Sequence, residues 1–218
     1  MARRTTPLVT NEIYHIFNRG VEKREIFLDR RDYQRFINVT WYYTVPEVSK
    51  YSLSSSTSGN TPRGWKTGGV RKKVEIICYC LMPNHYHFLL RQEETSGVSS
   101  FISLIQNSYT RYFNTKYKRI GPLFQGPFKA VRVETEEQLL HLSRYIHLNP
   151  FVADLVKNPE AYQWSSLEDY FGSKEREVST EIVLSHFNKS KGGYRKFVID
   201  HADYAKALEK IKHQAIDL

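Results

Sequence analysis

Two histidines that follow a short turn have the types and spacing that could do chemistry. His85 and His87 stand two positions apart in an apolar stretch that resumes after Pro83 and Asn84. Because alternate residues of a β-strand point to the same face, both imidazoles should lie on one side of the strand. Two imidazoles on one face could bind a single metal ion. The pair is also compatible with a half-buried strand whose polar face carries histidines, so a second feature is needed to decide.

A helix further along the chain supplies more reactive groups. Thr135 followed by Gln138 predicts a capping box at the start of this helix, and Pro150 predicts its end. The helix should be amphipathic, because apolar residues recur in it at helical spacing. The predicted core-facing stripe consists of Leu139, Leu142 and Ile146.

On this helix a tyrosine and an asparagine lie one turn apart. His141, Tyr145 and Asn149 recur every four residues and therefore form one line along the helix. A tyrosine hydroxyl is a potential nucleophile, but its ordinary pKa of about 10 requires a group that takes its proton. His141 and His147 are candidates for that role, and packing in the core is the alternative for each. Asn149 directly precedes Pro150, so a helix-terminating pair also explains it.

Apolar periodicity predicts the elements that must position these groups. We expect strands over residues 13–18, 74–81, 85–91 and 128–133, and helices over 29–37 and 98–117 in addition to the tyrosine-bearing helix. The resulting order, β-α-β-β-α-β-α, is a split βαβ arrangement with an extra helix. The predicted fold class is therefore α+β, a ferredoxin-like antiparallel sheet with helices on one face and a C-terminal helical extension.

The length of the chain suits one domain with two additions. We assign residues 1–172 to that domain and residues 173–218 to the helical extension. Residues 45–73 contain a run rich in serine, threonine and glycine. Such a composition cannot bury enough apolar surface to order itself, so this segment is predicted to be a flexible insertion.

Five blocks of the sequence occur in an order that is typical of one protein family. They are Tyr14-His15-Ile16-Phe17-Asn18-Arg19-Gly20, Pro83-Asn84-His85-Tyr86-His87, Gly121-Pro122-Leu123-Phe124-Gln125-Gly126-Pro127-Phe128-Lys129, Tyr145-Ile146-His147-Leu148-Asn149-Pro150 and Trp164-Ser165-Ser166. In these blocks, over roughly residues 10–172, the chain resembles the REP-associated tyrosine transposases, part of the wider group of single-tyrosine HUH nucleases. A lone His-x-His motif has little specificity, whereas five ordered blocks have much more.

The resemblance implies a role for each of four residues. His85 and His87 match the metal-binding histidines of the family, and Tyr145 matches its nucleophile. Asn149 matches the polar residue that completes the metal site, which is a glutamine in some relatives. Tyr86 is bulkier than the aliphatic residue usual between the histidines, but on a strand it faces away from the metal.

The resemblance also implies an activity. It predicts a metal-dependent endonuclease and strand transferase, a transposase that cuts single-stranded DNA at or near palindromic hairpins of REP elements. The reaction would pass through a covalent 5′-phosphotyrosine, and the divalent cofactor would be Mg²⁺ or Mn²⁺. The oligomeric state stays open, as does whether the tyrosine acts within its own chain.

The composition favours a polyanionic partner. The formal net charge is +9, the sequence pI is about 9.4, and 14% of the residues are aromatic, which suits stacking on unpaired bases. The candidate DNA-binding residues are Arg19, Arg71, Lys72, Lys73, Lys116, Lys118, Arg119 and Lys129. No apolar run approaches the roughly 18 residues of a membrane span, and no secretory signal is evident, so we expect a cytoplasmic protein without a membrane partner.

Two other functions are compatible with the same residues. Cys78, Cys80, His85 and His87 would be four zinc ligands if the turn between them folded back as a hairpin, and the site would then be structural. Packing as small core residues is the simpler explanation of the two cysteines. Alternatively, the same fold could hold a nucleic-acid hairpin without cutting it.

Overall fold

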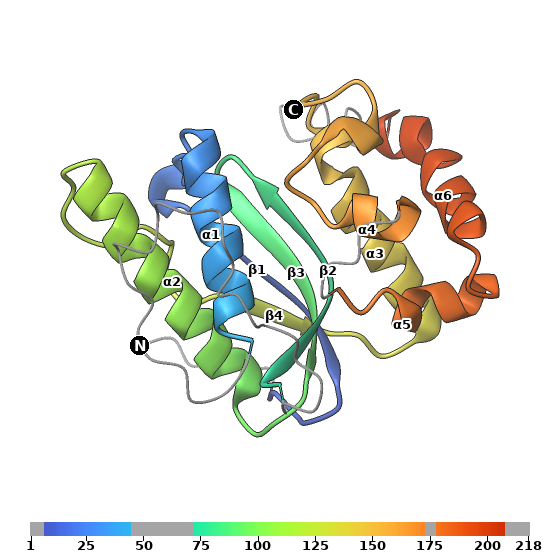
Figure 1. Ribbon diagram of the computed structural model, residues 1–218, viewed down its shortest axis with the longest axis horizontal. Helices are drawn as coiled ribbons and strands as arrows, with labels where there is room; N and C mark the ends of the chain where they lie inside the picture. Colours follow the sequence, from blue (N-terminus) through green and yellow to red (C-terminus); the bar gives the residue numbers. More distant parts are fainter. Residues whose placement is uncertain (1–6, 45–71, 173–177, 208–218) are drawn as a thin grey trace, which may run out of the picture. The chain divides into compact units, whose positions relative to one another are not determined.

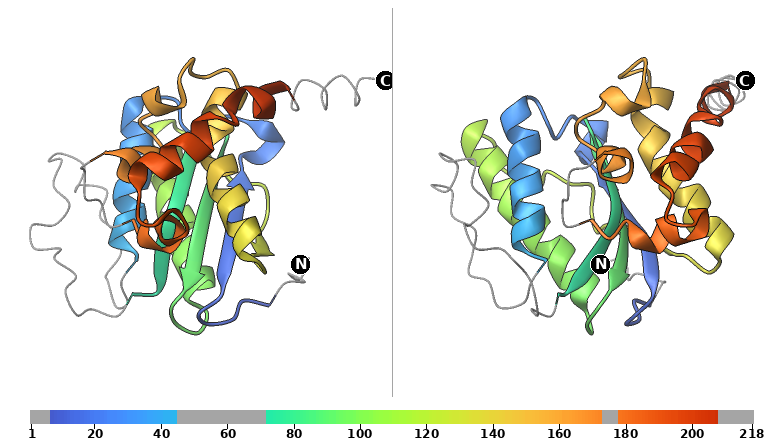
Figure 2. Two further views of the ribbon diagram at one scale, coloured as in Figure 1. Left: turned by 90° about the vertical axis from the view of Figure 1, so that its right-hand side faces the viewer. Right: turned by 45° about the vertical axis from the view of Figure 1, so that its right-hand side comes forward.

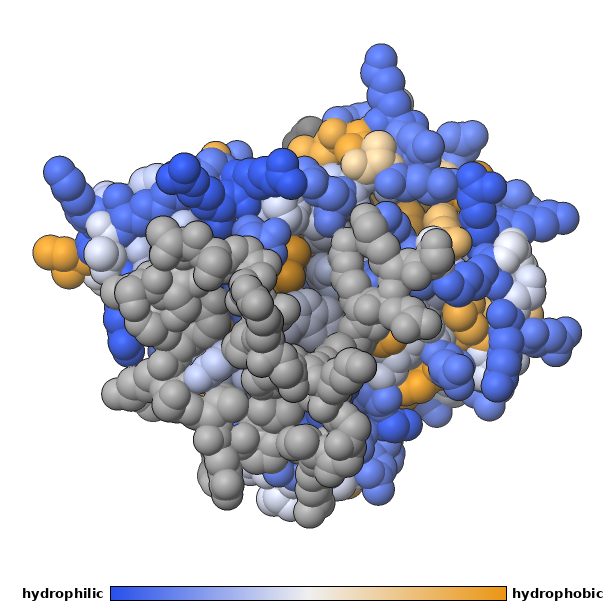
Figure 3. Space-filling model, viewed as in Figure 1, coloured by the Kyte–Doolittle hydropathy of each residue, from blue (hydrophilic) through white to orange (hydrophobic). Residues whose placement is uncertain are grey.

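The structure is a computed structural model that describes residues 7–44, 72–172 and 178–207. Of the predicted insertion over 45–73, residues 45–71 lie outside this part of the chain. No helix among the described residues is long and apolar enough to cross a membrane. Among the described residues seen in Figure 3, most at the surface are hydrophilic, with apolar residues scattered among them.

Four strands form one sheet in the described part of the chain (Figure 1). They are β1 (Ile13–Arg19), β2 (Val74–Met82), β3 (His85–Gln92) and β4 (Lys129–Arg132), in the order β2-β3-β1-β4. The backbone N–H of Gly20 donates to Asn84 at 2.8 Å, and that of Gln92 donates to Glu12 at 3.0 Å, so β1 and β3 run antiparallel. β1 and β4 are antiparallel as well. This order is that of a split βαβ fold, which confirms the predicted α+β class.

Helices connect and follow the strands in the predicted order. The longer ones are α1 (Arg30–Tyr42), α2 (Gly97–Lys116) and α3 (Glu136–Val152), and the shorter ones are α4 (Leu167–Phe171), α5 (Glu181–Leu184) and α6 (Lys191–Ile199). Single 3-10 turns are η1 (Val21–Lys23), η3 (Pro159–Ala161) and η4 (Ser185–Phe187). Each of the predicted strands and longer helices is present, with ends that differ by a few residues.

The chain forms two compact units that interleave along the sequence. The first draws on residues up to Glu75, on Pro83–Tyr86 and on Leu90–Arg132. The second draws on Ile76–Met82, His87–Leu89 and the residues from Val133 onwards. Within the second unit, α6 packs against both α3 and α4 (Figure 2). The domain boundary at residue 172 stays a prediction.

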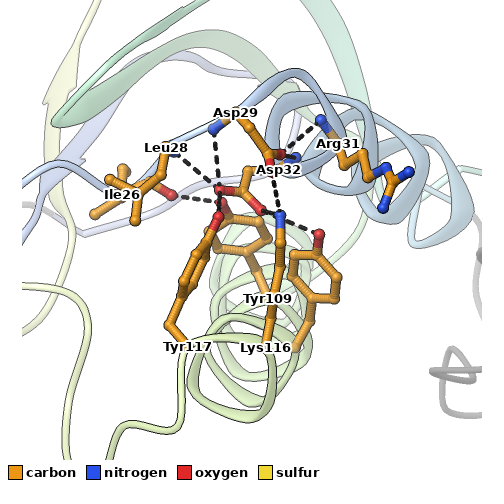
Figure 4. Close-up of polar contacts among 9 residues, drawn as sticks. Ile26, Leu28, Asp29, Arg31, Asp32, Tyr109, Lys116 and Tyr117 are labelled. Carbon is orange, nitrogen blue, oxygen red and sulfur yellow. Dashed lines mark hydrogen bonds and ion pairs between the residues drawn. The ribbon is translucent and has the colours of Figure 1, made fainter.

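A buried carboxylate joins the two long helices of the first unit (Figure 4). Asp32 is fully buried in the first turn of α1, where it forms a capping box with Asp29. It accepts hydrogen bonds from the Tyr117 hydroxyl at 2.8 Å and the Tyr112 hydroxyl at 3.0 Å. The Lys116 ammonium lies 2.7 Å from Asp32 and 2.7 Å from Asp29. The end of α2 is therefore held at the start of α1 by several charge-assisted hydrogen bonds.

Asp32→Ala is expected to lower the free energy of unfolding by about 3–5 kcal/mol, because it removes a fully buried carboxylate and leaves its partly buried donors without their acceptor. Asp29→Ala should cost only about 1 kcal/mol, since it removes a helix cap that is half exposed. Urea denaturation followed by far-UV circular dichroism measures both changes. Asp203→Ala, at an exposed position, is the control, and an Asp32 variant as stable as this control would contradict the assignment.

Helix α3 begins near the predicted residue but ends later. Thr135 accepts a hydrogen bond from the Gln138 backbone at 3.1 Å, whereas the Gln138 side chain bonds Glu134 and not Thr135, so only half of the capping box forms. The prediction that Pro150 ends the helix is wrong, because Pro150 lies inside it. Proline removes one backbone donor, but only two helical residues follow it, so little of the hydrogen-bond ladder is disturbed.

The buried face of α3 differs in part from the predicted stripe. Leu139 and Ile146 are buried as predicted, but Leu142 is only partly buried. Ser143 and His147 are fully buried in its place. Two polar side chains can occupy a buried face only when they find hydrogen-bond partners. Ser143 donates to the backbone oxygen of Leu140 in the same helix, whereas its other partner, Tyr194, and both partners of His147 come from distant segments.

Candidate active site

Tyr145 projects from α3 and contacts a histidine of β3. Its side chain is half exposed, and its ring centroid lies 5.6 Å from that of His87 in an edge-on arrangement, with 83° between the ring planes. Both residues belong to the second unit of the same chain. The nucleophile candidate and one metal-ligand candidate are therefore neighbours within one polypeptide, which the sequence left open.

The hydroxyls of Tyr109 and Tyr112 on α2 form hydrogen bonds that hold the fold together. The Tyr109 hydroxyl donates to the backbone oxygen of Ile26, and burial together with the charge of Asp32 raises the pKa of Tyr109. Burial and the charge of Asp32 also raise the pKa of Tyr112, to about 12. A phenol whose pKa is raised is a weaker source of phenolate, so neither side chain suits a nucleophilic role.

His85 and His87 occupy the first and third positions of β3, as predicted. His85 is half-buried and His87 is 6% exposed. The Nδ1 atom of His85 lies 2.6 Å from the side-chain oxygen of Asn84. Because a carboxamide oxygen only accepts, Nδ1 carries the proton and Nε2 keeps the lone pair that a metal would use. This hydrogen bond fits the role of a metal-binding histidine.

The third predicted ligand, Asn149, follows Tyr145 by one helical turn and is partly buried. In the described part of the chain, no group of three or more His, Cys, Asp or Glu side chains is placed to hold a metal ion. The predicted set differs from such a group, because it has only two of these side chains, both imidazoles, and its third ligand is a carboxamide. Such a set leaves coordination positions open for substrate and water, as catalytic sites require.

The structural zinc alternative is not supported. Cys78 and Cys80 are free thiols that lie fully buried in β2, and Cys80 pairs with Ser165 across an isolated bridge. Burial raises the pKa of both thiols. Both cysteines and both histidines are among the described residues, and they do not form a metal cluster.

His147 ties α3 to its surroundings and does not face the site. Its Nδ1 atom lies 2.8 Å from the Tyr194 hydroxyl, and its Nε2 atom lies 2.8 Å from the Ser166 hydroxyl. Burial lowers the pKa of His147 to about 3, so the ring is neutral. Tyr194 also donates to Ser143 at 3.1 Å. With both ring nitrogens engaged, His147 is a structural residue and not the proton acceptor considered from the sequence.

The predicted DNA-binding residues fall into different environments. Arg19 and Lys129 are exposed on β1 and β4, where Arg19 bonds Gln125 at 2.6 Å and the Lys129 ammonium lies 5.9 Å from the Phe17 ring. Lys118 is exposed just after α2. These three side chains are accessible to a nucleic acid.

The remaining basic candidates form ion pairs or hydrogen bonds, are partly buried, or lie outside the described residues. Lys116 holds Asp29 and Asp32, as described above, and Arg119 bonds Asn114 at 2.9 Å. Lys72 and Lys73 are partly buried at the start of β2, and Arg71 lies outside the described residues. Sequence composition alone could not separate the exposed side chains from those held in ion pairs.

Comparison with known proteins shows which family and which fold this chain is similar to. Residues 67–149 match the family model described as transposase IS200 like, a span that contains His85, His87, Tyr145 and Asn149. A solved structure described as a REP-associated tyrosine transposase bound to a REP hairpin is similar in fold, with a TM-score of 0.53 and 15% sequence identity. The similarity covers 78% of this chain and 84% of that chain. No curated protein sequence matched. The resemblance to these transposases that the motifs indicated is confirmed.

Proposed function

We propose that this protein is a metal-dependent endonuclease and strand transferase that cuts single-stranded DNA at or near hairpins. The observation that carries the proposal is the placement of Tyr145, half exposed and 5.6 Å from the ring of His87 in the same chain. A reactive phenol beside a metal-ligand candidate supplies the two groups that phosphodiester cleavage by a tyrosine needs. This placement also favours a nucleophile that acts within its own chain.

In the proposed reaction, the hydroxyl oxygen of Tyr145 forms a bond to phosphorus while the bond to the 3′ oxygen breaks. The phenol loses its proton, and the departing 3′ oxygen takes up a proton. The products are a 5′-phosphotyrosine and a free 3′-hydroxyl, and the phosphotyrosine bond retains the energy for later joining to a second strand. His85, His87 and Asn149 would hold a divalent ion, which supplies positive charge to the non-bridging phosphate oxygens. Imidazole ligands favour Mn²⁺ over Mg²⁺, whereas abundance favours Mg²⁺.

The proposed DNA partner is a strand with a palindromic hairpin. The solved transposase that shares the fold is bound to a REP hairpin, and this chain has a net charge of +9. Exposed Arg19, Lys118 and Lys129 are the best-placed candidates for contacts with backbone phosphates. Such contacts supply affinity that falls with salt concentration and carry no sequence preference.

A palindromic single-stranded oligonucleotide labelled at either end tests this function. With Mn²⁺ or Mg²⁺, a denaturing gel should show a shortened strand with a free 3′ end and a protein-linked strand labelled on the other side of the cut. Chelation of the divalent ion should remove both products. Hairpin binding without any product in either metal would contradict the proposal and would favour a binding module that does not cut.

A further inference from the structure

A buried guanidinium lies next to the proposed nucleophile. Arg144 directly precedes Tyr145 on α3 and is only 8% exposed. Its guanidinium lies 4.3 Å from the ring centroid of Phe197 on α6, and among the described residues no carboxylate pairs with it. A cation is costly to bury without a counter-charge. The arrangement leaves a positive charge beside the site that an anion could neutralise.

Arg144 also selects the tautomer of a neighbouring neutral histidine ring. Its Nη2 atom lies 2.8 Å from Nδ1 of His141. Because a guanidinium only donates, Nδ1 of His141 must accept, and the ring proton is on Nε2. His141 therefore offers an N–H donor, and its only lone pair is already used. This excludes His141, in this arrangement, as the group that takes the proton of Tyr145.

The donor atom of His141 is accessible from solvent. The His141 side chain is 54% exposed, and Nε2 lies 3.6 Å from the carboxylate of Glu137, whose side chain is 85% exposed. A carboxylate therefore already lies near this nitrogen, and its side chain is mostly exposed. His141 precedes Tyr145 by four residues, which places it about 6 Å away along the helix axis.

We propose that Arg144 and His141 form a binding site for a backbone phosphate of the DNA strand, adjacent to the phosphate that Tyr145 attacks. Arginine and histidine donors are the usual partners of phosphate oxygens. The separation of about one helical turn between His141 and Tyr145 suits neighbouring phosphates of a single strand. The inference rests on the proposed function.

Single methylphosphonate linkages, which remove the charge of one phosphate, test the site. They are placed in turn at each linkage that flanks the cut, and the dissociation constant is measured in a Tyr145→Phe background so that the strand stays intact. One position should weaken binding by about tenfold, as loss of a charged hydrogen bond predicts. In a variant that also carries His141→Ala, the effect of the same position should be smaller, because one of its two proposed donors is missing.

Two further variants sharpen the test. His186→Ala replaces a histidine of η4 that lies 3.6 Å from Glu136 of α3, and it should leave the methylphosphonate pattern of the parent unchanged. Glu137→Gln removes the competing carboxylate and should tighten binding of the unmodified strand. Equal sensitivity at every linkage, with or without His141, would overturn the proposed site. If the protein with Tyr145 unchanged formed no covalent adduct with the DNA, that result would instead contradict the proposed function.

Discussion

Tyr145→Phe is expected to abolish the covalent protein–DNA adduct, with a fall in strand cleavage of at least about a thousandfold. The change removes the one oxygen that would form the bond to phosphorus. It removes almost no volume, and the Tyr145 side chain is half exposed, so the fold and the affinity for hairpin DNA should be retained. Gel analysis of the adduct and mass spectrometry of the wild-type peptide measure the effect and locate the linkage.

Tyr42→Phe is the matched control, since Tyr42 is a partly buried tyrosine at the end of α1. It should form the adduct normally. An adduct that maps to Tyr109, Tyr112 or Tyr117 would move the nucleophile to α2 or the residue after it, against the hydrogen bonds that hold those hydroxyls.

His85→Ala and His87→Ala are each expected to abolish cleavage in Mn²⁺ and Mg²⁺ while hairpin binding changes little. Each removes one proposed metal ligand, whereas most of the affinity for DNA comes from basic side chains elsewhere. Titration with Mn²⁺, followed by electron paramagnetic resonance, should show weaker metal binding in both variants. Asn149→Ala should raise the metal concentration needed for cleavage, because it removes the third ligand.

His186→Ala again serves as the control, because this histidine faces Glu136 at the start of α3. It should cleave normally at the same metal concentration. Normal cleavage by the His85 or the His87 variant in Mn²⁺ would show that the metal assignment is wrong, even if Tyr145 remained the nucleophile.

Local patterns in the sequence were sufficient to predict the strands and longer helices and to select the candidate site residues. Period-two alternation predicted β3 with His85 and His87 on one face, and the Thr135 cap predicted the start of α3. The helical period placed Tyr145 and Asn149 one turn apart. These features depend on residues within a few positions of one another, so backbone geometry alone relates them.

Contacts between distant segments were decided only by the tertiary structure. Burial of His147 depends on Tyr194 and Ser166, and Lys116 pairs with Asp29 and Asp32, more than eighty positions away. The approach of Tyr145 to His87 likewise joins residues of separate elements. No periodicity reports such partners, because the free energy of burying a polar group depends on which donors and acceptors the fold brings to it.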